Sequence, residues 1–206
     1  GDGYDLRWFT PTLEVELCGH ATLASAFLIF ERFAKDAGIL RFQTRSDELT
    51  VSRKDGMLFL DFPSYLGPAV DCPPALADGL GAAPQEVIEG PNYMAVFRSD
   101  ADIARLAPNM DRLATLHPRG VIATAPGDAV DFVSRFFGPS FGVPEDPVTG
   151  SAHCMLTPYW AKRLGKNRMD ARQISKRGGT LVCEDRGERV GIGGQAVLYL
   201  EGKITV

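Results

Sequence analysis

The order of apolar and polar residues along the chain predicts many short strands. Apolar residues alternate with polar ones from Tyr4 to Phe9, as in a strand with one buried face. A proline-containing break at 10–12 separates this run from a short strand around Val15 and Leu17. Further strand-like runs occupy residues 40–44, 49–53, 57–62, 93–97, 121–125, 130–137, 172–175, 180–184, 189–193, 195–200 and 204–206.

Two longer segments have the spacing of helices. In 21–36, the residues Leu23, Phe27, Phe30 and Ala34 fall on one helical face, and Gly38 is the expected C-cap. The second long helix is expected at 152–164, with a proline inside it that favours a kink. Shorter helices are expected at 76–80, 84–88, 99–106 and 111–116.

Turn and breaker residues divide this pattern into domains. Asp55-Gly56 lies between two strand-like runs and predicts a tight hairpin. The proline-rich stretch 63–84 is the expected crossing between domains. We therefore expect an N-terminal half at 1–64, joined by a last strand at 202–206, and a C-terminal half at 65–201. Since strands outnumber helices, the fold class is α+β with mixed or antiparallel sheets.

Composition narrows the classes of function. The 206 residues are 45% apolar and 23% charged, so a packed core is expected. A net charge of −4 argues against nucleic-acid binding, and no apolar run is long enough to cross a membrane. The four cysteines lack the spacing of a zinc site, so no metal is expected. A soluble, cytoplasmic protein is the expectation.

A short internal similarity indicates the site. Cys18-Gly19-His20-Ala21-Thr22 and Thr149-Gly150-Ser151-Ala152-His153 share glycine at the second place and alanine at the fourth, and each opens a long predicted helix. The first N–H groups of a helix lack intrahelical partners and carry partial positive charge. Two such ends facing each other would hold a carboxylate, or the enolate formed next to it.

Two longer runs carry a family resemblance. Residues 6–11 with 17–23 (LRWFTP and LCGHATL) resemble the first signature of the phenazine-biosynthesis-like isomerases. Residues 145–153 (EDPVTGSAH) resemble the second. The resemblance implies a diaminopimelate-epimerase-like fold, with two pseudo-symmetric halves that each wrap a sheet around a central helix. It also implies that the protein is a cytoplasmic homodimer, acts in a biosynthetic process and needs no cofactor.

The resemblance further implies a reaction and its residues. Characterised phenazine enzymes of the family isomerise a dihydro-hydroxyanthranilate by moving a proton. His20 and Asp146 then correspond to catalytic residues. Substrate-binding roles fall to Gly19, Thr149, Gly150 and Ser151.

The proton-carrying glutamate of the family lies before the first signature and is not among these residues. No feature of the sequence assigns the role of that glutamate to Glu14, Glu16 or Glu145. We expect a preceding segment, because the chain starts with Gly1 and enters strand-like sequence at once.

Each site residue also has a purely structural interpretation. His20 could bind a neighbouring carbonyl, and Asp146 could serve a turn. Thr149 and Ser151 are ordinary N-cap residues in this interpretation. Glu145 is expected to be a solvated loop residue, and His153 a packing residue.

Three hypotheses remain open. The first is a cofactor-independent isomerase of a small carboxylate-bearing substrate. The second is an epimerase or racemase that uses the thiol of Cys18, which a helix N-terminus would acidify; it is disfavoured because Thr149 stands where a second thiol would be needed. The third is a catalytically silent protein that binds a small carboxylate.

Overall fold

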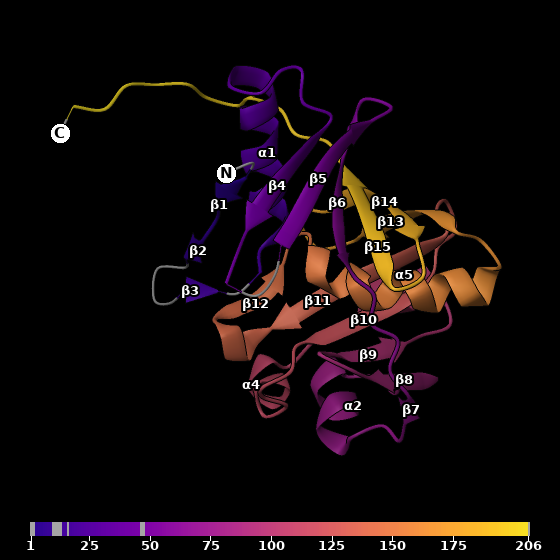
Figure 1. The fold of residues 1–206 in the computed structure, drawn as a ribbon. Helices are drawn as coiled ribbons and strands as arrows, with labels where there is room; N and C mark the ends of the chain where they lie inside the picture. Colours follow the sequence, from indigo (N-terminus) through magenta and orange to yellow (C-terminus); the bar gives the residue numbers. More distant parts are fainter. Residues whose placement is uncertain (1–2, 10–13, 16, 46–47, 206) are drawn as a thin grey trace. The chain divides into compact units, whose positions relative to one another are not determined.

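The computed structural model describes residues 3–9, 14–15, 17–45 and 48–205. The chain divides into two compact units (Figure 1). The first unit comprises residues 1–61 together with 193–206, and the second comprises 62–192. The expected break at 10–12 lies outside the described residues.

Unit 1 contains a small mixed sheet and one long helix. Its sheet has the order β1-β4-β5-β6, in which β1 runs parallel to β4 and the other neighbours are antiparallel, while β2 and β3 form a separate antiparallel pair. Its elements are β1 (Tyr4–Asp5), β2 (Trp8–Phe9), β3 (Glu14–Val15), α1 (Gly19–Arg32), β4 (Ile39–Gln43), β5 (Glu48–Lys54) and β6 (Met57–Pro63).

Strand alternation and turn chemistry explain the sheet of unit 1. Leu40 and Phe42 of β4 are buried while their neighbours are exposed, which is the period of a half-buried strand. Between β5 and β6, Asp55 and Gly56 have φ values of 53° and 73°. Positive φ at both central residues is the requirement of a type I′ hairpin turn, so the predicted hairpin is confirmed.

Arg53 of β5 contacts helix α1. Thr22, Ala26 and Phe30 form its buried stripe. The guanidinium of Arg53 lies 4.4 Å from the ring centre of Phe30, and its Nη2 is 2.9 Å from Oε1 of Glu31. The helix begins two residues earlier than expected and ends at Arg32, with Phe33 and not Gly38 as its C-cap.

Unit 2 combines a larger mixed sheet with four helices. Its strands follow the order β15-β14-β13-β11-β10-β9-β8-β7, with β12 paired to β11. The pairs β9–β10 and β11–β13 are parallel. The elements are β7 (Ala69–Val70), α2 (Pro74–Leu80), β8 (Glu86–Glu89), β9 (Tyr93–Val96), α3 (Asp100–Arg105), α4 (Met110–Ala114), β10 (Val121–Pro126), β11 (Phe132–Gly138), the 3₁₀ turn η1 (Pro139–Phe141), β12 (Val143–Asp146), α5 (Gly150–Leu164), β13 (Arg168–Gln173), β14 (Gly179–Asp185) and β15 (Arg189–Gly194).

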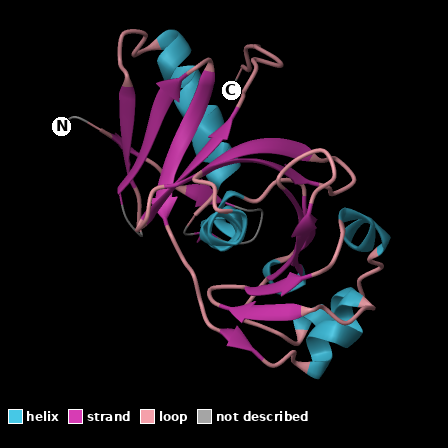
Figure 2. Cartoon of the chain, turned by 90° about the vertical axis from the view of Figure 1, so that its right-hand side faces the viewer, coloured by secondary structure: helices cyan, strands magenta, loops and turns pink. Residues whose placement is uncertain are grey.

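Helix α5 is the centre of unit 2. All residues from 152 to 161 are buried, as in a helix covered on every side. Trp160 donates from Nε1 to Oγ1 of Thr124 on β10 at 3.0 Å and stacks on Phe132 of β11 at 5.8 Å between ring centres. From the preceding position, the Tyr159 hydroxyl donates to Glu86 on β8. Strands thus surround the helix, which Figure 2 shows end-on.

Several expected elements are wrong. Residues 86–88 of the segment expected as a helix at 84–88 belong to strand β8, and β12 was not expected at all. The run 4–9 is two short strands rather than one. Residues 195–205 form no strand and are mostly exposed, so neither the strand at 195–200 nor the described part of the last strand at 202–206 exists in the structure.

None of the helices in the described ranges has the length and apolar character needed to span a bilayer.

Candidate functional site

The first motif forms the beginning of α1. Cys18 is the N-cap residue, with φ −142° and ψ 97°. Its carbonyl accepts hydrogen bonds from the backbone N of Thr22 at 3.1 Å and from the Thr22 hydroxyl at 2.7 Å. Because Thr22 is fully buried, these two bonds fix the place where the helix starts. Gly19 is the first helical residue and is buried.

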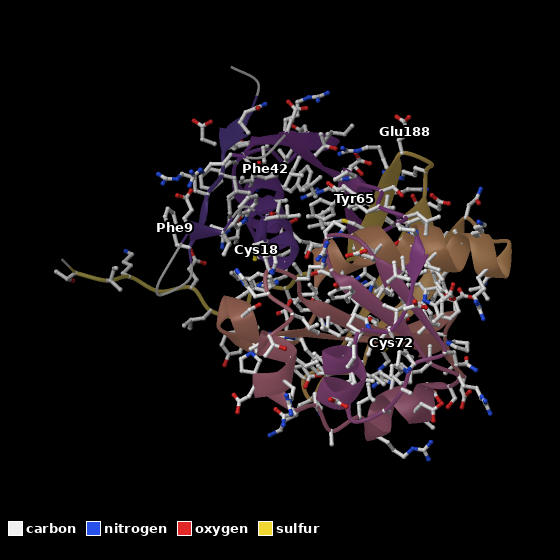
Figure 3. All side chains as sticks on the ribbon, turned by 90° about the horizontal axis from the view of Figure 1, so that it is seen from below. Phe9, Cys18, Phe42, Tyr65, Cys72 and Glu188 are labelled. Atoms are coloured by element: carbon white, nitrogen blue, oxygen red, sulfur yellow. The ribbon has the colours of Figure 1, made fainter. Side chains whose placement is uncertain are left out.

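His20 and Cys18 lie side by side at this helix start. The imidazole of His20 is exposed, and its Nε2 lies 3.5 Å from Sγ of Cys18, within hydrogen-bonding distance for sulfur. Cys18 itself is half-buried (Figure 3). A proton-accepting or proton-donating ring next to a thiol is an arrangement in which either group can exchange a proton with a ligand.

The second motif is held by a hydrogen-bond network inside unit 2. The Thr149 hydroxyl donates to Oδ2 of Asp146 at 2.5 Å, and the backbone N of Thr149 donates to Oε1 of Gln173 at 2.9 Å. In return, Nε2 of Gln173 donates to the carbonyl of Asp146 at 2.7 Å and to Oγ1 of Thr149 at 3.1 Å. The loop before α5 is therefore tied to β13.

His153 supports the same loop from the interior. Its Nδ1 lies 2.7 Å from the carbonyl of Thr149 and must donate to it, because a carbonyl oxygen only accepts. The ring is fully buried, and this burial lowers the pKa of His153 to about 4. At neutral pH the ring is uncharged, and Nε2 finds no partner among the described residues. The predicted packing role is consistent with this position.

The two long helices differ from α3 and α4 at their first turns. Ser99 caps α3 by accepting from the N–H of Asp102, and Asn109 caps α4 by accepting from that of Arg112. Helix α2 also has no side-chain cap and no acidic residue in its first turn, but Pro73 stands at its N-cap and Pro74 at its first position. At the N-caps of α1 and α5, neither the Cys18 nor the Thr149 side chain makes a capping hydrogen bond, and no acidic residue occupies either first turn.

Two structural interpretations of the second motif are thereby corrected. Thr149 stands at the N-cap, but its hydroxyl bonds to Asp146 instead of capping the helix. Glu145 is not a solvated loop residue, since its carboxylate forms a two-pronged ion pair with Arg135 at 2.7 and 3.0 Å and its side chain is only 22% exposed. Ser151 is half-buried in the first turn of α5, and none of the described residues bonds to its hydroxyl.

Two residues that hold this motif were not predicted from the sequence. Gln173 and Arg135 lie on strands β13 and β11, and no local motif marks either of them. The only signal in the sequence was a polar residue at a strand position that faces the interior. Arg135 also donates to the carbonyl of Leu106 at 2.9 Å, which joins the motif to the segment after α3.

The remaining thiols have other surroundings. Cys154 and Cys183 are buried, and burial raises the pKa of each thiol to about 12, so both stay protonated at neutral pH. Cys72 is exposed (Figure 3). In the part of the chain that the structure describes, no three His, Cys, Asp or Glu side chains are grouped to hold a metal ion.

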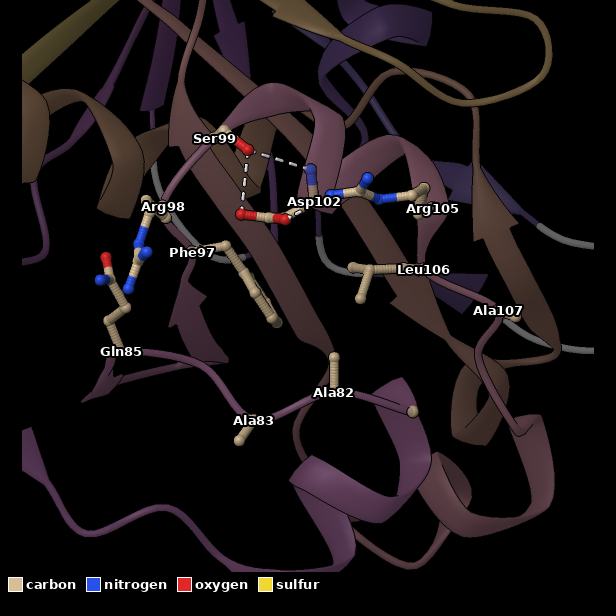
Figure 4. Close-up of a pocket in the computed structure, with 11 residues that line it drawn as sticks. Ala82, Ala83, Gln85, Phe97, Arg98, Ser99, Asp102, Arg105, Leu106 and Ala107 are labelled. Atoms are coloured by element: carbon tan, nitrogen blue, oxygen red, sulfur yellow. Dashed lines mark hydrogen bonds and ion pairs between the residues drawn. The ribbon is translucent and has the colours of Figure 1, made fainter.

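A separate hollow of about 540 Å³ lies between the end of α2 and helix α3 (Figure 4). Phe97 and Leu106 contribute apolar surface to it, and its one carboxylate, Asp102, is bonded to Ser99 and Arg105. None of the predicted site residues lines this hollow. The motif residues therefore define the candidate site independently of it.

Fold and motifs together define an α+β protein of the diaminopimelate-epimerase-like class, with a glycine-containing motif at the start of each long helix. The chain belongs to the phenazine biosynthesis-like protein family, whose family model matches residues 2–202. The resemblance seen in the sequence is thus confirmed.

Individual relatives support the assignment. A protein of Pseudomonas aeruginosa named as an "uncharacterized isomerase" is 50% identical over 201 residues, which cover 98% of this chain and 78% of that protein. The crystal structure of a phenazine biosynthesis protein of the PhzF family from Enterococcus faecalis superposes with a TM-score of 0.95 at 42% identity, covering 100% of this chain and 80% of the other. The chain therefore belongs to a family of isomerase-like proteins.

A more distant structure supports the fold alone. A predicted epimerase from Pseudomonas aeruginosa superposes with a TM-score of 0.64 at 17% identity, covering 94% of this chain and 76% of the other. At this level of identity, a shared fold does not show which reaction the protein catalyses.

Proposed function

We propose that this protein is a cofactor-independent isomerase that moves a proton on a small carboxylate-bearing substrate. One observation carries the proposal. The two helices that begin with the family's motifs lack side-chain caps and acidic residues in their first turns, whereas α3 and α4 are capped by Ser99 and Asn109. The partial positive charge at such a helix start, with no acidic side chain beside it, favours an anionic ligand.

The proposed binding groups follow from that observation. The backbone N–H groups at Gly19 and Gly150 would each face a substrate oxygen, because glycine allows close approach to the backbone. The partial positive charge of each helix N-terminus favours a carboxylate and stabilises an enolate formed next to it. At the second motif, the Ser151 hydroxyl would donate to the substrate, while Thr149 shapes the loop.

The proposed catalytic roles belong to His20 and Asp146. His20 is exposed at the start of α1, where its ring can relay a proton near neutral pH. Asp146 has one carboxylate oxygen bound by Thr149, and none of the described residues donates to its other oxygen, Oδ1. That oxygen would accept a hydrogen bond from the substrate. The proton-carrying carboxylate itself is, by family resemblance, a glutamate before the first signature.

The test is proton exchange catalysed by the full natural protein. Dihydro-hydroxyanthranilate is incubated with the protein in D₂O, and deuterium uptake at ring carbons is followed by NMR. We expect His20→Ala to lower the exchange rate by about 10²–10⁴-fold, which is the usual contribution of a general acid or base. His117→Ala, the same change at an exposed loop histidine, should leave the rate unchanged. Near-normal exchange in the His20 variant contradicts the assignment.

A second candidate is an epimerase that uses the thiol of Cys18. The 3.5 Å separation of its Sγ from Nε2 of His20 favours it, because a neighbouring imidazolium promotes the thiolate. The test uses a Cys72→Ser background, which removes the exposed thiol. If alkylation of Cys18 by iodoacetamide leaves exchange intact, the thiol mechanism is excluded.

Two further expectations accompany the proposal. Binding of the carboxylate without any hydrogen exchange would favour a silent binding protein over both enzymes. The homodimer that the family resemblance implies stays a prediction, and sedimentation velocity of the purified protein measures it directly.

A further inference from the structure

Gln173 is the polar side chain around which the second motif is organised. It is the last residue of β13 and is fully buried. Its neighbours across the sheet are Ser134 on β11 and Gly179 on β14, so the backbone at this point is fixed on both sides. A buried amide is favourable only when its donors and acceptor are satisfied.

The orientation of this amide follows from its partners. Oε1 faces the backbone N–H of Thr149, at 2.9 Å between heavy atoms, and Nε2 faces the carbonyl of Asp146 at 2.7 Å. A flipped amide would place a donor against a donor and an acceptor against an acceptor. Only the observed orientation satisfies both contacts.

The direction of the next hydrogen bond follows as well. Nε2 of Gln173 also donates to the Thr149 hydroxyl, at 3.1 Å. That hydroxyl has a single proton, which it donates to Oδ2 of Asp146 at 2.5 Å. A directed chain of bonds therefore runs from the Gln173 amide through Thr149 to the carboxylate of Asp146.

Thr149 has no polar group left to rearrange. Its N–H binds Gln173, its hydroxyl binds Asp146, and its carbonyl accepts from Nδ1 of His153 at 2.7 Å. The residue directly after it, Gly150, begins α5. A movement of the Asp146 carboxylate relative to the first turn of α5 would break several of these buried bonds at once.

We infer that Gln173 is a positioning residue: from the interior of unit 2, it holds the Asp146 carboxylate and the first N–H groups of α5 in one fixed arrangement. The inference rests on the proposed function, since that arrangement is useful only if both groups meet a substrate. Gln173 acts through Asp146 and Thr149. A displacement of about 1 Å in a catalytic group is enough to lower a rate about 10²-fold.

Gln173→Glu is the sharpest test, because the new side chain has nearly the same volume but lacks both N–H donors of the amide. The new carboxyl oxygen would face the Asp146 carbonyl, and two acceptors repel each other. Gln173→Met removes all polar contacts at similar length. Gln85→Glu is the matched control, since it makes the same chemical change at an exposed position of unit 2.

Two readouts separate positioning from stability. In the deuterium-uptake assay, we expect kcat of Gln173→Glu to fall about 10²-fold and kcat of Gln85→Glu to match that of the wild type. The melting temperature of each variant is measured alongside, to separate a loss of rate from a loss of stability. By NMR, hydrogen exchange of the Thr149 N–H should become at least about tenfold faster in Gln173→Met. Thr149→Ser, which keeps the hydroxyl, should retain most of the rate, whereas Thr149→Val should not.

The readouts also separate this inference from the proposed function. If the wild-type protein exchanges no hydrogen on dihydro-hydroxyanthranilate, the proposed function fails for that substrate, and exchange of the Thr149 N–H still decides the role of Gln173. Unchanged exchange at Thr149 in Gln173→Met, or a wild-type kcat in Gln173→Glu, overturns the inference.

Discussion

Burial sets the protonation state of individual residues in unit 2. His153 has no exposed surface, and its pKa lies at about 4 because burial penalises the charged ring. In the unfolded chain, a histidine has a pKa of about 6.5. At a pH between those two pKa values, the unfolded state binds a proton at His153 that the folded state does not bind.

This difference predicts a pH dependence of stability. Because the folded pKa is lowered, stability is complete above about pH 7 and falls as the pH drops from about 6.5 toward 4. One pKa unit corresponds to about 1.4 kcal/mol, so the His153 contribution to the free energy of unfolding should fall by roughly 2 kcal/mol between pH 7 and pH 5. Urea unfolding at several pH values measures it.

His153→Asn is the matched variant. The asparagine amide can replace Nδ1 as the donor to the Thr149 carbonyl, and it does not titrate. The difference in unfolding free energy between wild type and variant should shrink as the pH falls. A constant difference from pH 7 to pH 5 would mean that His153 does not titrate as its burial implies.

The proposed site residues could be named from the sequence, but the side chains that hold them could not. Cys18 and His20 lie in a short run that also carries the internal similarity, and Asp146 lies in the run that resembles the second family signature. Gln173 is 24 residues away from Thr149, and only the pairing of β13 with its neighbours brings the two together. A contact of that kind depends on the tertiary fold, so a single sequence cannot reveal it.

Helix capping is the clearest effect at the scale of elements. Ser99 accepts from the N–H of Asp102 at 3.3 Å and donates to its carboxylate at 2.9 Å, which is a reciprocal capping arrangement at the start of α3. The sequence predicted this helix. The starts of α1 and α5 were placed two residues late, because glycine at 19 and 150 is a poor helix former.

Removal of the α3 cap predicts a measurable loss of stability. Ser99→Ala should lower the free energy of unfolding by about 1 kcal/mol, because one N–H of the first turn loses its acceptor. Urea denaturation measures the change. Ser99→Thr keeps the hydroxyl and should retain most of the stability; an equal loss in both variants would show that the hydroxyl is not the cause.

Local propensity also failed where sheet pairing decided the outcome. Residues 84–88 were expected to be helical, yet β8 pairs with both β7 and β9. Val87 and Ile88 are buried there, and Glu86 accepts a hydrogen bond from Tyr159. Tertiary pairing thus overrode a weak preference, as is usual for short segments.

At the scale of the whole chain, the segment 195–205 stands out by its exposure. Val197, Tyr199 and Leu200 are 83%, 96% and 77% exposed, respectively. Their apolar character suggested a strand, but the described segment forms no strand. A strand needs a partner as well as a pattern, and the pattern alone cannot show whether one is present. Exposed apolar side chains in extended backbone favour association with another chain.

This exposure predicts concentration-dependent self-association. Replacement of Val197, Tyr199 and Leu200 by Thr, Ser and Ser should reduce it, as measured by sedimentation velocity over a range of concentrations. The control is Ala196→Ser with Gly202→Ser, which changes the same segment without removing large apolar side chains. If both sets of variants associate as the wild type does, another surface is responsible.

The way in which the second motif is anchored has a consequence for how the protein can diversify. The shape of the loop from Asp146 to Gly150 is determined by side chains on β13 and α5, which are buried. Exchanges among exposed residues therefore leave the loop geometry intact. A lineage that keeps Gln173 and His153 can accumulate changes around this loop without first having to rebuild the arrangement that we propose to bind the carboxylate.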